Sequence, residues 1–128
     1  MILLDTNVCI RILRGRKEAL DAFSANAGNV AVPFMALGEL YYGAARSADP
    51  KRGKYLVDSF SRILPIVHAS QETMARFGEE KARLAVAGSP VEDADILIAS
   101  IALVNGFQVA TGNIRHFSRF EGLDILVW

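Results

Sequence analysis

Short apolar runs alternate along this chain with longer stretches in which apolar residues recur at helical spacing. The run 1–4 is apolar and is followed by turn-forming polar residues, which is typical of a buried strand. From Phe34, apolar residues recur at Leu37, Leu40 and Ala44, the spacing of a helix face. Applied to the whole chain, this pattern predicts strands at 1–4, 29–32, 64–67, 107–111 and 123–128, and helices at about 6–15, 17–25, 34–45, 50–63, 70–87 and 95–105.

Residues with strong local preferences mark the ends of these elements. Thr6 or Asn7 is expected to cap the first helix, and Ser70 to cap the fifth, because short polar side chains accept hydrogen bonds from free N–H groups. Gly106 follows the last helical residue, a common stop signal. Pro65 lacks an N–H group and marks its strand as an edge strand or as a strand start.

Strands that alternate with helices predict an α/β fold, a sandwich with a mostly parallel central sheet. No repeat, low-complexity tract or linker divides residues 1–128, so we expect one domain. In parallel sheets, sites form at the carboxyl ends of the strands. Asp5 lies at the end of the first strand and 111–113 at the end of a later one, so polar residues far apart in sequence are expected to meet there.

Composition favours a cytoplasmic protein without a membrane span. The chain has 128 residues, of which 52% are hydrophobic, but no apolar run approaches the roughly 18–20 residues that a span requires. The N-terminus lacks the features of a signal peptide. Cys9 is the single cysteine, which excludes an internal disulfide and suits the cytosol. The high apolar content predicts that part of the surface meets a partner, in a dimer or with another chain.

Charge argues weakly against nucleic-acid binding. Fourteen basic and fourteen acidic residues balance, whereas nucleic-acid-binding domains are more often basic. The basic residues nevertheless gather in three places, at 11–17, 51–54 and 115–119. Solvent-exposed helix faces explain such clusters equally well.

Three carboxylates, Asp5, Glu39 and Asp95, each lie in or beside an apolar element. A buried acid is costly unless a cation offsets its charge, and Mg²⁺ and Mn²⁺ prefer oxygen ligands. Together the three predict a metal-dependent phosphodiesterase. Taken singly, each has a simpler explanation: Asp5 and Asp95 suit helix N-termini, and Glu39 can extend to solvent.

Four segments resemble, in order, the motifs of PIN-domain nucleases. They are Leu3–Asn7, Gly38–Ala44, Asp95–Ala99 and Thr111–Phe117. A Gly122-Leu123 pair and a terminal Trp128 follow, as in the tail of that family. Length and motif order are similar to those of the VapC group, the toxins of type II toxin–antitoxin pairs.

This resemblance implies an endoribonuclease dependent on Mg²⁺ or Mn²⁺, homodimeric, held inactive by a VapB-type antitoxin and directed at RNA, with a tRNA loop favoured. Asp5, Glu39 and Asp95 would be the metal-site carboxylates. Asn113 would be the fourth catalytic residue, at a position where the family often has another acid, and its uncharged amide argues against a second tightly bound metal. The remaining candidates are Thr6 or Asn7, which would position the substrate or a water molecule, and Arg14, Lys17 and Arg115, which charge alone suggests for flanking phosphates.

Other interpretations stay open. A catalytically weak PIN-like module that binds RNA or protein is favoured by Asn113 and the neutral charge, and an RNA-processing PIN nuclease without an antitoxin is a third possibility. An aspartyl-phosphate phosphatase requires a second acid two residues after the first, where this chain has Asn7. Asp93 is an alternative acid for the site or a helix cap. His68 and His116 are interpreted as structural or surface residues, outside the catalytic set.

Overall fold

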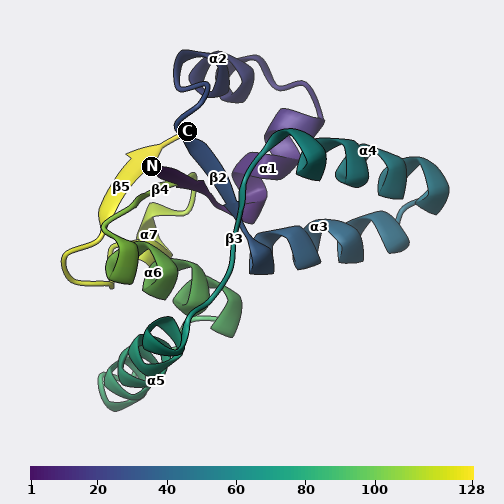
Figure 1. Cartoon of the computed structure of the whole chain (residues 1–128). Coiled ribbons are helices and arrows are strands. Elements are labelled where there is room, and N and C mark those ends of the chain that lie inside the picture. The colour runs from purple at the N-terminus through teal and green to yellow at the C-terminus, as the bar shows by residue number, and fades with distance from the viewer.

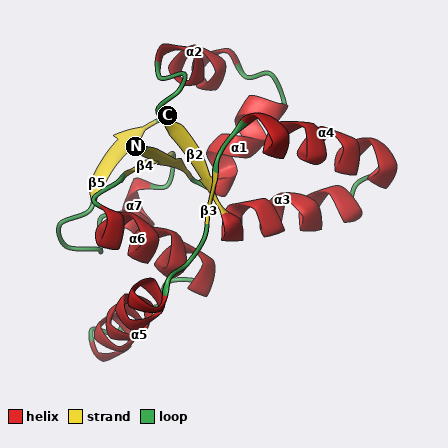
Figure 2. Ribbon diagram, viewed as in Figure 1, coloured by secondary structure: helices red, strands yellow, loops and turns green.

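The computed structural model describes all of residues 1–128 and contains a central sheet of five parallel strands with helices on both faces (Figure 1, Figure 2). The strand order is β3-β2-β1-β4-β5. The α/β fold with a parallel sheet is therefore confirmed. The strands are β1 (Ile2–Leu4), β2 (Val30–Pro33), β3 (Ile66–Val67), β4 (Gln108–Thr111) and β5 (Asp124–Val127).

Seven helices connect the strands. Crossovers between parallel strands are right-handed, so a change in the direction of strand order moves the helices to the other face. Figure 1 shows α1, α3 and α4 on one side of the sheet and α5 and α6 on the other. The helices are α1 (Thr6–Leu13), α2 (Lys17–Ala25), α3 (Phe34–Ala45), α4 (Pro50–Ile63), α5 (Gln71–Val86), α6 (Asp93–Asn105) and α7 (Ile114–Phe117).

The strand order reverses at β1, the central strand. From β1 the chain builds outward to β2 and β3 on one side, and then to β4 and β5 on the other. Leu3 of β1 is in register with Ala31 of β2 and with Val109 of β4. The loops that leave β1 and β4 therefore diverge to opposite faces, and a crevice forms at the carboxyl ends of these two strands.

The core explains why α6 is almost uniformly apolar. The residues of β1 are fully or nearly fully buried, and so is the whole stretch Ile96–Ala102 of α6. This helix packs against α5, α3, α7 and β4, so no face of it meets solvent along that stretch. A helix surrounded on all sides needs apolar residues all round, and its sequence has them.

Several predicted helix ends are confirmed by their hydrogen bonds. The Ser70 hydroxyl accepts from the Thr73 N–H at 3.1 Å, and the Asp49 side chain accepts from the Arg52 N–H at 3.1 Å. Gly106 follows α6 with φ of +66°, the left-handed conformation that glycine adopts at low cost. Pro65 precedes β3, which is an edge strand as predicted.

Two predictions of local structure were wrong, and one short helix was missed. Asp5, and not Thr6 or Asn7, caps α1, because its carboxylate accepts from the Thr6 N–H at 2.7 Å. Helix α6 begins at Asp93 and not at Asp95, with Glu92 at the cap position. The short helix α7 was not predicted, because one turn is too short to show a periodic pattern.

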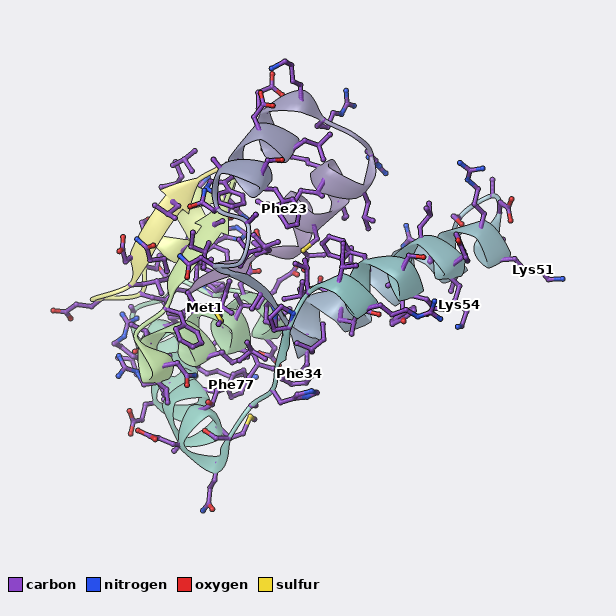
Figure 3. All side chains as sticks on the ribbon, turned by 45° about the horizontal axis from the view of Figure 1, so that its top comes forward. Met1, Phe23, Phe34, Lys51, Lys54 and Phe77 are labelled. Carbon is purple, nitrogen blue, oxygen red and sulfur yellow. The ribbon has the colours of Figure 1, made fainter.

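Three expectations from composition concerned Cys9, membrane spans and the basic clusters. Cys9 is fully buried, and burial raises the pKa of its thiol, so it is an ordinary core residue. None of the helices combines the length and apolar character needed to cross a membrane. Lys51 and Lys54 lie on α4, which extends away from the sheet, and Figure 3 shows their side chains at its outer part, directed to solvent.

Candidate active site

A polar pocket of about 320 Å³ lies at the crevice predicted by the strand order. Its walls come from the start of α1, the outer half of α3, the start of α6, and the segment that joins β4 to α7. The lining residues are Asp5, Thr6, Asn7, Ile10, Glu39, Tyr42, Gly43, Arg46, Glu92, Asp95, Asn113 and His116. Three segments far apart in sequence thus contribute carboxylates to one hollow.

Asp5 forms the floor of this pocket and is 4% exposed. One carboxylate oxygen accepts from the Thr6 N–H at 2.7 Å, and the other accepts from the Thr111 hydroxyl at 2.8 Å. The Thr111 hydroxyl in turn accepts from the Asn113 N–H at 2.9 Å. Thr111 at the end of β4 therefore fixes the orientation of the Asp5 side chain, which directly follows β1.

Glu39 reaches the pocket from α3 and is half-buried. Its carboxylate accepts from the Thr6 hydroxyl at 2.9 Å. Thr6 thus connects two of the acids, since its N–H bonds Asp5 and its hydroxyl bonds Glu39. In the structure, Thr6 positions the carboxylates of Asp5 and Glu39, whereas the sequence suggested that it positions the substrate or a water molecule.

Asp95 enters from the first turn of α6 and contacts His116 of α7. The His116 Nδ1 lies 2.9 Å from the Asp95 carboxylate and 2.8 Å from the Asn113 amide nitrogen. The side chains of Asp95 and His116 are 18% and 38% exposed, so both line the pocket while they support each other. The short helix α7 thus orients the third carboxylate.

The three acids interact electrostatically. Burial raises the pKa of Asp5, and the negative charges of Asp95 and Glu39 raise it further, although the hydrogen bonds from Thr111 and Thr6 act in the opposite direction. A buried acid held among like charges destabilises the folded chain unless a cation is added. No lysine or arginine pairs with any of the three.

The donor set suits a hard divalent cation, since Asp5, Glu39 and Asp95 supply carboxylate oxygens around a pocket that holds water-sized space. The side chains as they stand do not form a closed cluster of three or more metal ligands. Each carboxylate bonds its own partner instead: Thr111 for Asp5, Thr6 for Glu39 and His116 for Asp95. The chemistry therefore fits a metal, and rotation of these side chains is required to hold it.

The structure brings together six of the residues named from sequence, namely Asp5, Thr6, Asn7, Glu39, Asp95 and Asn113. Arg14 lines a separate, mostly apolar hollow of about 220 Å³ that shares Glu39 with the pocket. Arg115 is exposed and lines neither hollow, and Lys17 pairs with Asp21 on α2.

The structure also bears on the two residues whose roles the sequence left open, Asp93 and His116. Asp93 forms an ion pair with Lys81 at 2.9 Å and stays outside the pocket, so it does not replace Asn113. The side chain of His116, which the sequence left outside the catalytic set, lies in the pocket wall and is 38% exposed. Its position three residues after Asn113, one helical turn, was the available signal.

Sequence reasoning also missed Glu92, Tyr42 and Arg46. Tyr42 and Arg46 follow Glu39 by three and seven residues, which places all three on one face of α3. That spacing was visible in the sequence, but which face of α3 meets the pocket depends on the packing of α3 against α1 and α6.

Comparisons with known proteins agree with this geometry. The family model of the PIN domain matches residues 2–123. The ribonuclease VapC2 of Haemophilus influenzae is 35% identical over 127 residues, which cover 98% of this chain and 96% of that protein. The tRNA(fMet)-specific endonuclease VapC of Salmonella typhimurium is 33% identical over the same shares of the two chains.

A solved structure is equally similar. The chain superposes with a TM-score of 0.93 and 32% identity on a chain of the DNA-bound VapBC complex from Salmonella typhimurium, covering 99% of this chain and 97% of that one. The class that fold and site define is the PIN domain, and the likeness to curated relatives extends over almost the whole chain. This chain belongs to the PIN-domain family and, within it, to the VapC ribonucleases.

Proposed function

We propose that this chain is a metal-dependent endoribonuclease that acts as the toxin of a VapBC-type pair, with Asp5, Glu39 and Asp95 as its metal-binding carboxylates. The observation that carries the proposal is the convergence of these three acids, none of them paired with a lysine or arginine, in one pocket of a chain of the VapC group. These carboxylates would hold Mg²⁺ or Mn²⁺, which would supply a bound water of lowered pKa and would neutralise charge on the scissile phosphate.

The residues of the chain hold the acids for that task. Thr111 and the Thr6 N–H fix Asp5, the Thr6 hydroxyl orients Glu39, and His116 orients Asp95. Water attacks the phosphorus in line while the bond between phosphorus and the 3′ oxygen breaks. One of the carboxylates accepts the proton of the attacking water, and the departing 3′ oxygen takes a proton from solvent water, so the products carry a 3′-hydroxyl and a 5′-phosphate. Asn113 adds an uncharged amide beside His116, so the negative charge of the site comes from the acids.

The substrate we propose is RNA cut in a single-stranded loop, where unpaired bases can turn outward and be read. A transfer RNA is the favoured target, since the Salmonella relative is named for a tRNA.

The partner we propose is a VapB-type antitoxin, as in the VapBC complex that this fold matches. Charge complementarity predicts that the antitoxin places a basic side chain near the acidic pocket. If replacing every antitoxin arginine and lysine at the contact left inhibition intact, this part of the proposal would be wrong. The toxin itself is proposed to be a homodimer, which sedimentation of the purified chain tests.

The decisive experiment is cleavage of a total tRNA pool by the purified chain, freed of antitoxin, with Mg²⁺ or Mn²⁺. We expect discrete fragments that disappear with EDTA and with the Asp5→Asn, Asp95→Asn double variant. Matched control substitutions are Asp21→Asn and Asp124→Asn, two exposed acids that do not line the pocket, and they should leave cleavage unchanged. Absence of cleavage with both metals would favour the alternative, a catalytically weak module that binds RNA or protein.

Metal binding has a readout that does not depend on activity. Mg²⁺ or Mn²⁺ should raise the melting temperature of the wild-type chain, because a ligand that binds only the folded state stabilises it. The Asp95→Asn variant should lose this increase, and the Asp21→Asn control should keep it. An equal increase in all three proteins would exclude the carboxylate pocket as the metal site.

A further inference from the structure

The polar pocket contains one permanently cationic side chain, and that side chain is stacked on an exposed aromatic ring. The Arg46 guanidinium lies 4.9 Å from the centre of the Tyr42 ring, and its Nη1 donates to the Tyr42 hydroxyl at 2.9 Å. Both residues line the pocket, one and two turns of α3 beyond Glu39. The pair therefore stands beside the carboxylates on the same helix face.

Tyr42 and Arg46 differ from the other cation–aromatic pairs of the molecule. Lys54 over Tyr41 and Lys81 over Phe77 are both also paired with carboxylates, those of Asp58 and Asp93. Arg46 has no carboxylate partner, and its one side-chain hydrogen bond goes to a neutral hydroxyl. Most of its five N–H donors therefore stay free to bind an anion.

Exposure of the tyrosine is equally unusual for a residue at a pocket. Tyr42 is 61% exposed, although an aromatic residue of this size normally buries most of its surface. Stacking under Arg46 holds the ring in place without burying it, because the cation contacts one face. A flat, rigid and accessible aromatic surface is what an unpaired base stacks on.

Charge decides which part of RNA each residue meets. Four carboxylates line the pocket, namely Asp5, Glu39, Glu92 and Asp95, and Arg46 is the one residue there that always carries a positive charge. A polyanion that approaches four acids needs a fixed cation at the edge to hold its backbone. Arginine suits this role because its planar fork binds phosphate oxygens in pairs.

We propose that Tyr42 and Arg46 form the nucleotide-binding edge of the site, where the Tyr42 ring stacks on a base next to the scissile phosphate and Arg46 binds an adjacent phosphate. This inference rests on the proposed function and adds to it the residues that hold the substrate. It replaces Arg115 in that role, because Arg115 lies outside the pocket.

Binding and cleavage test the proposal separately. Binding is measured by fluorescence anisotropy with a labelled single-stranded RNA of twelve nucleotides, using proteins that carry Asp95→Asn so that the probe stays intact. We expect Tyr42→Ala to weaken binding about thirty-fold, the middle of the range for loss of one stacked base. Tyr42→Trp should bind at least as tightly as the parent, and Arg46→Lys should recover only part of what Arg46→Ala loses.

A probe of the same length whose sugars lack bases separates the two roles. On this probe Tyr42→Ala should have no effect, while Arg46→Ala should still weaken binding, because only the phosphates remain. Tyr55→Ala and Arg16→Ala are matched controls, since both residues are exposed and lie outside the pocket. With the active chain and the tRNA pool, Tyr42→Ala should mainly raise KM.

The outcomes distinguish this inference from the proposed function. If the parent chain neither binds RNA nor cleaves it, both are wrong. If the parent binds and cleaves while Tyr42→Ala and Arg46→Ala behave like Tyr55→Ala and Arg16→Ala, only the nucleotide-binding edge is wrong. If these two substitutions leave RNA binding unchanged but abolish inhibition by the antitoxin, the edge is a protein contact and the inference is overturned.

Discussion

Two carboxylates in this protein are almost equally buried but have opposite surroundings. Glu80 on α5 is 6% exposed and Asp5 is 4% exposed. Glu80 accepts from Nε of Arg76 and from Nε of Arg83, each at 3.0 Å. Asp5 accepts only from the neutral donors of Thr6 and Thr111, and its nearest charges are other acids. The chain thus neutralises one buried acid with its own arginines and provides no cation for the other.

The comparison shows how to separate a structural acid from a functional one. Burial alone does not distinguish them, because a buried carboxylate in a scaffold and one in an active site are equally hidden from water. The sign of the neighbouring charges does distinguish them. An acid that keeps like-charged neighbours at a cost in stability marks a site, because nothing in folding favours that arrangement.

Removing the arginines of α5 should make Glu80 resemble Asp5. The Arg76→Met, Arg83→Met double variant leaves a buried carboxylate without a cation, and we expect it to lose about 3 kcal/mol of stability. This corresponds to a fall in melting temperature of about 10 °C. Adding Glu80→Met should restore most of the loss, because the uncompensated charge is gone. An unchanged melting temperature in the double variant would contradict the structural role of the network.

Removing the support of Asp95 should slow the reaction without harming the fold. His116→Ala deletes the hydrogen bond at 2.9 Å that orients the carboxylate, and we expect kcat to fall about ten-fold. His116→Asn, which keeps a donor near that position, should recover part of the rate. His68→Ala is the matched control, because this histidine stacks on Phe34 away from the pocket. Equal rates for both alanine variants would exclude His116 as a positioning residue.

Removing the charge of Asp5 should stabilise the protein while it abolishes cleavage. Burial and the nearby acids raise the pKa of Asp5, so the folded protein binds this proton more tightly than the unfolded chain does. The resulting cost is absent below the unfolded value of 3.8, and it develops as the pH rises through the raised folded-state pKa.

Asp5→Asn should therefore raise the melting temperature at pH 7, measured without metal, by about 3 °C, or roughly 1 kcal/mol. An asparagine still accepts from the Thr6 N–H, and its amide can donate to the Thr111 hydroxyl oxygen, so the local hydrogen bonds survive. The gain should disappear when the melt is repeated below pH 3.8. A gain of the same size at both pH values would show that charge is not its cause.

The smallest expected change in stability comes from the exposed ion pair of Lys17 and Asp21. Its atoms are 2.6 Å apart, but both side chains are more than half exposed. Solvent screening makes such a pair worth less than about 0.5 kcal/mol, so Lys17→Ala should shift the melting temperature by no more than about 2 °C. A larger shift would mean that ion pairs stabilise this fold even without burial, and the contrast between Glu80 and Asp5 would lose its basis.

The sequence by itself determined the features that depend on neighbours along the chain. The strands, the six longer helices, the cap at Ser70 and the stop at Gly106 follow from local hydrogen bonds and apolar spacing. The convergence of Asp5 and 111–113 followed as well, because parallel strands end at one edge of the sheet. The resemblance to PIN domains rested on motifs that could be compared without any structure.

Only the tertiary structure decided which side chains share the pocket and what each of them contacts. Whether Tyr42 and Arg46 face the acids depends on how α3 is rotated against α1 and α6, and a rotation of one residue would turn them away. The exclusion of Arg115 and Asp93 and the contact of His116 with Asp95 depend in the same way on packing between distant segments. Local preferences carry no information on these contacts, because each one joins residues that folding alone brings together.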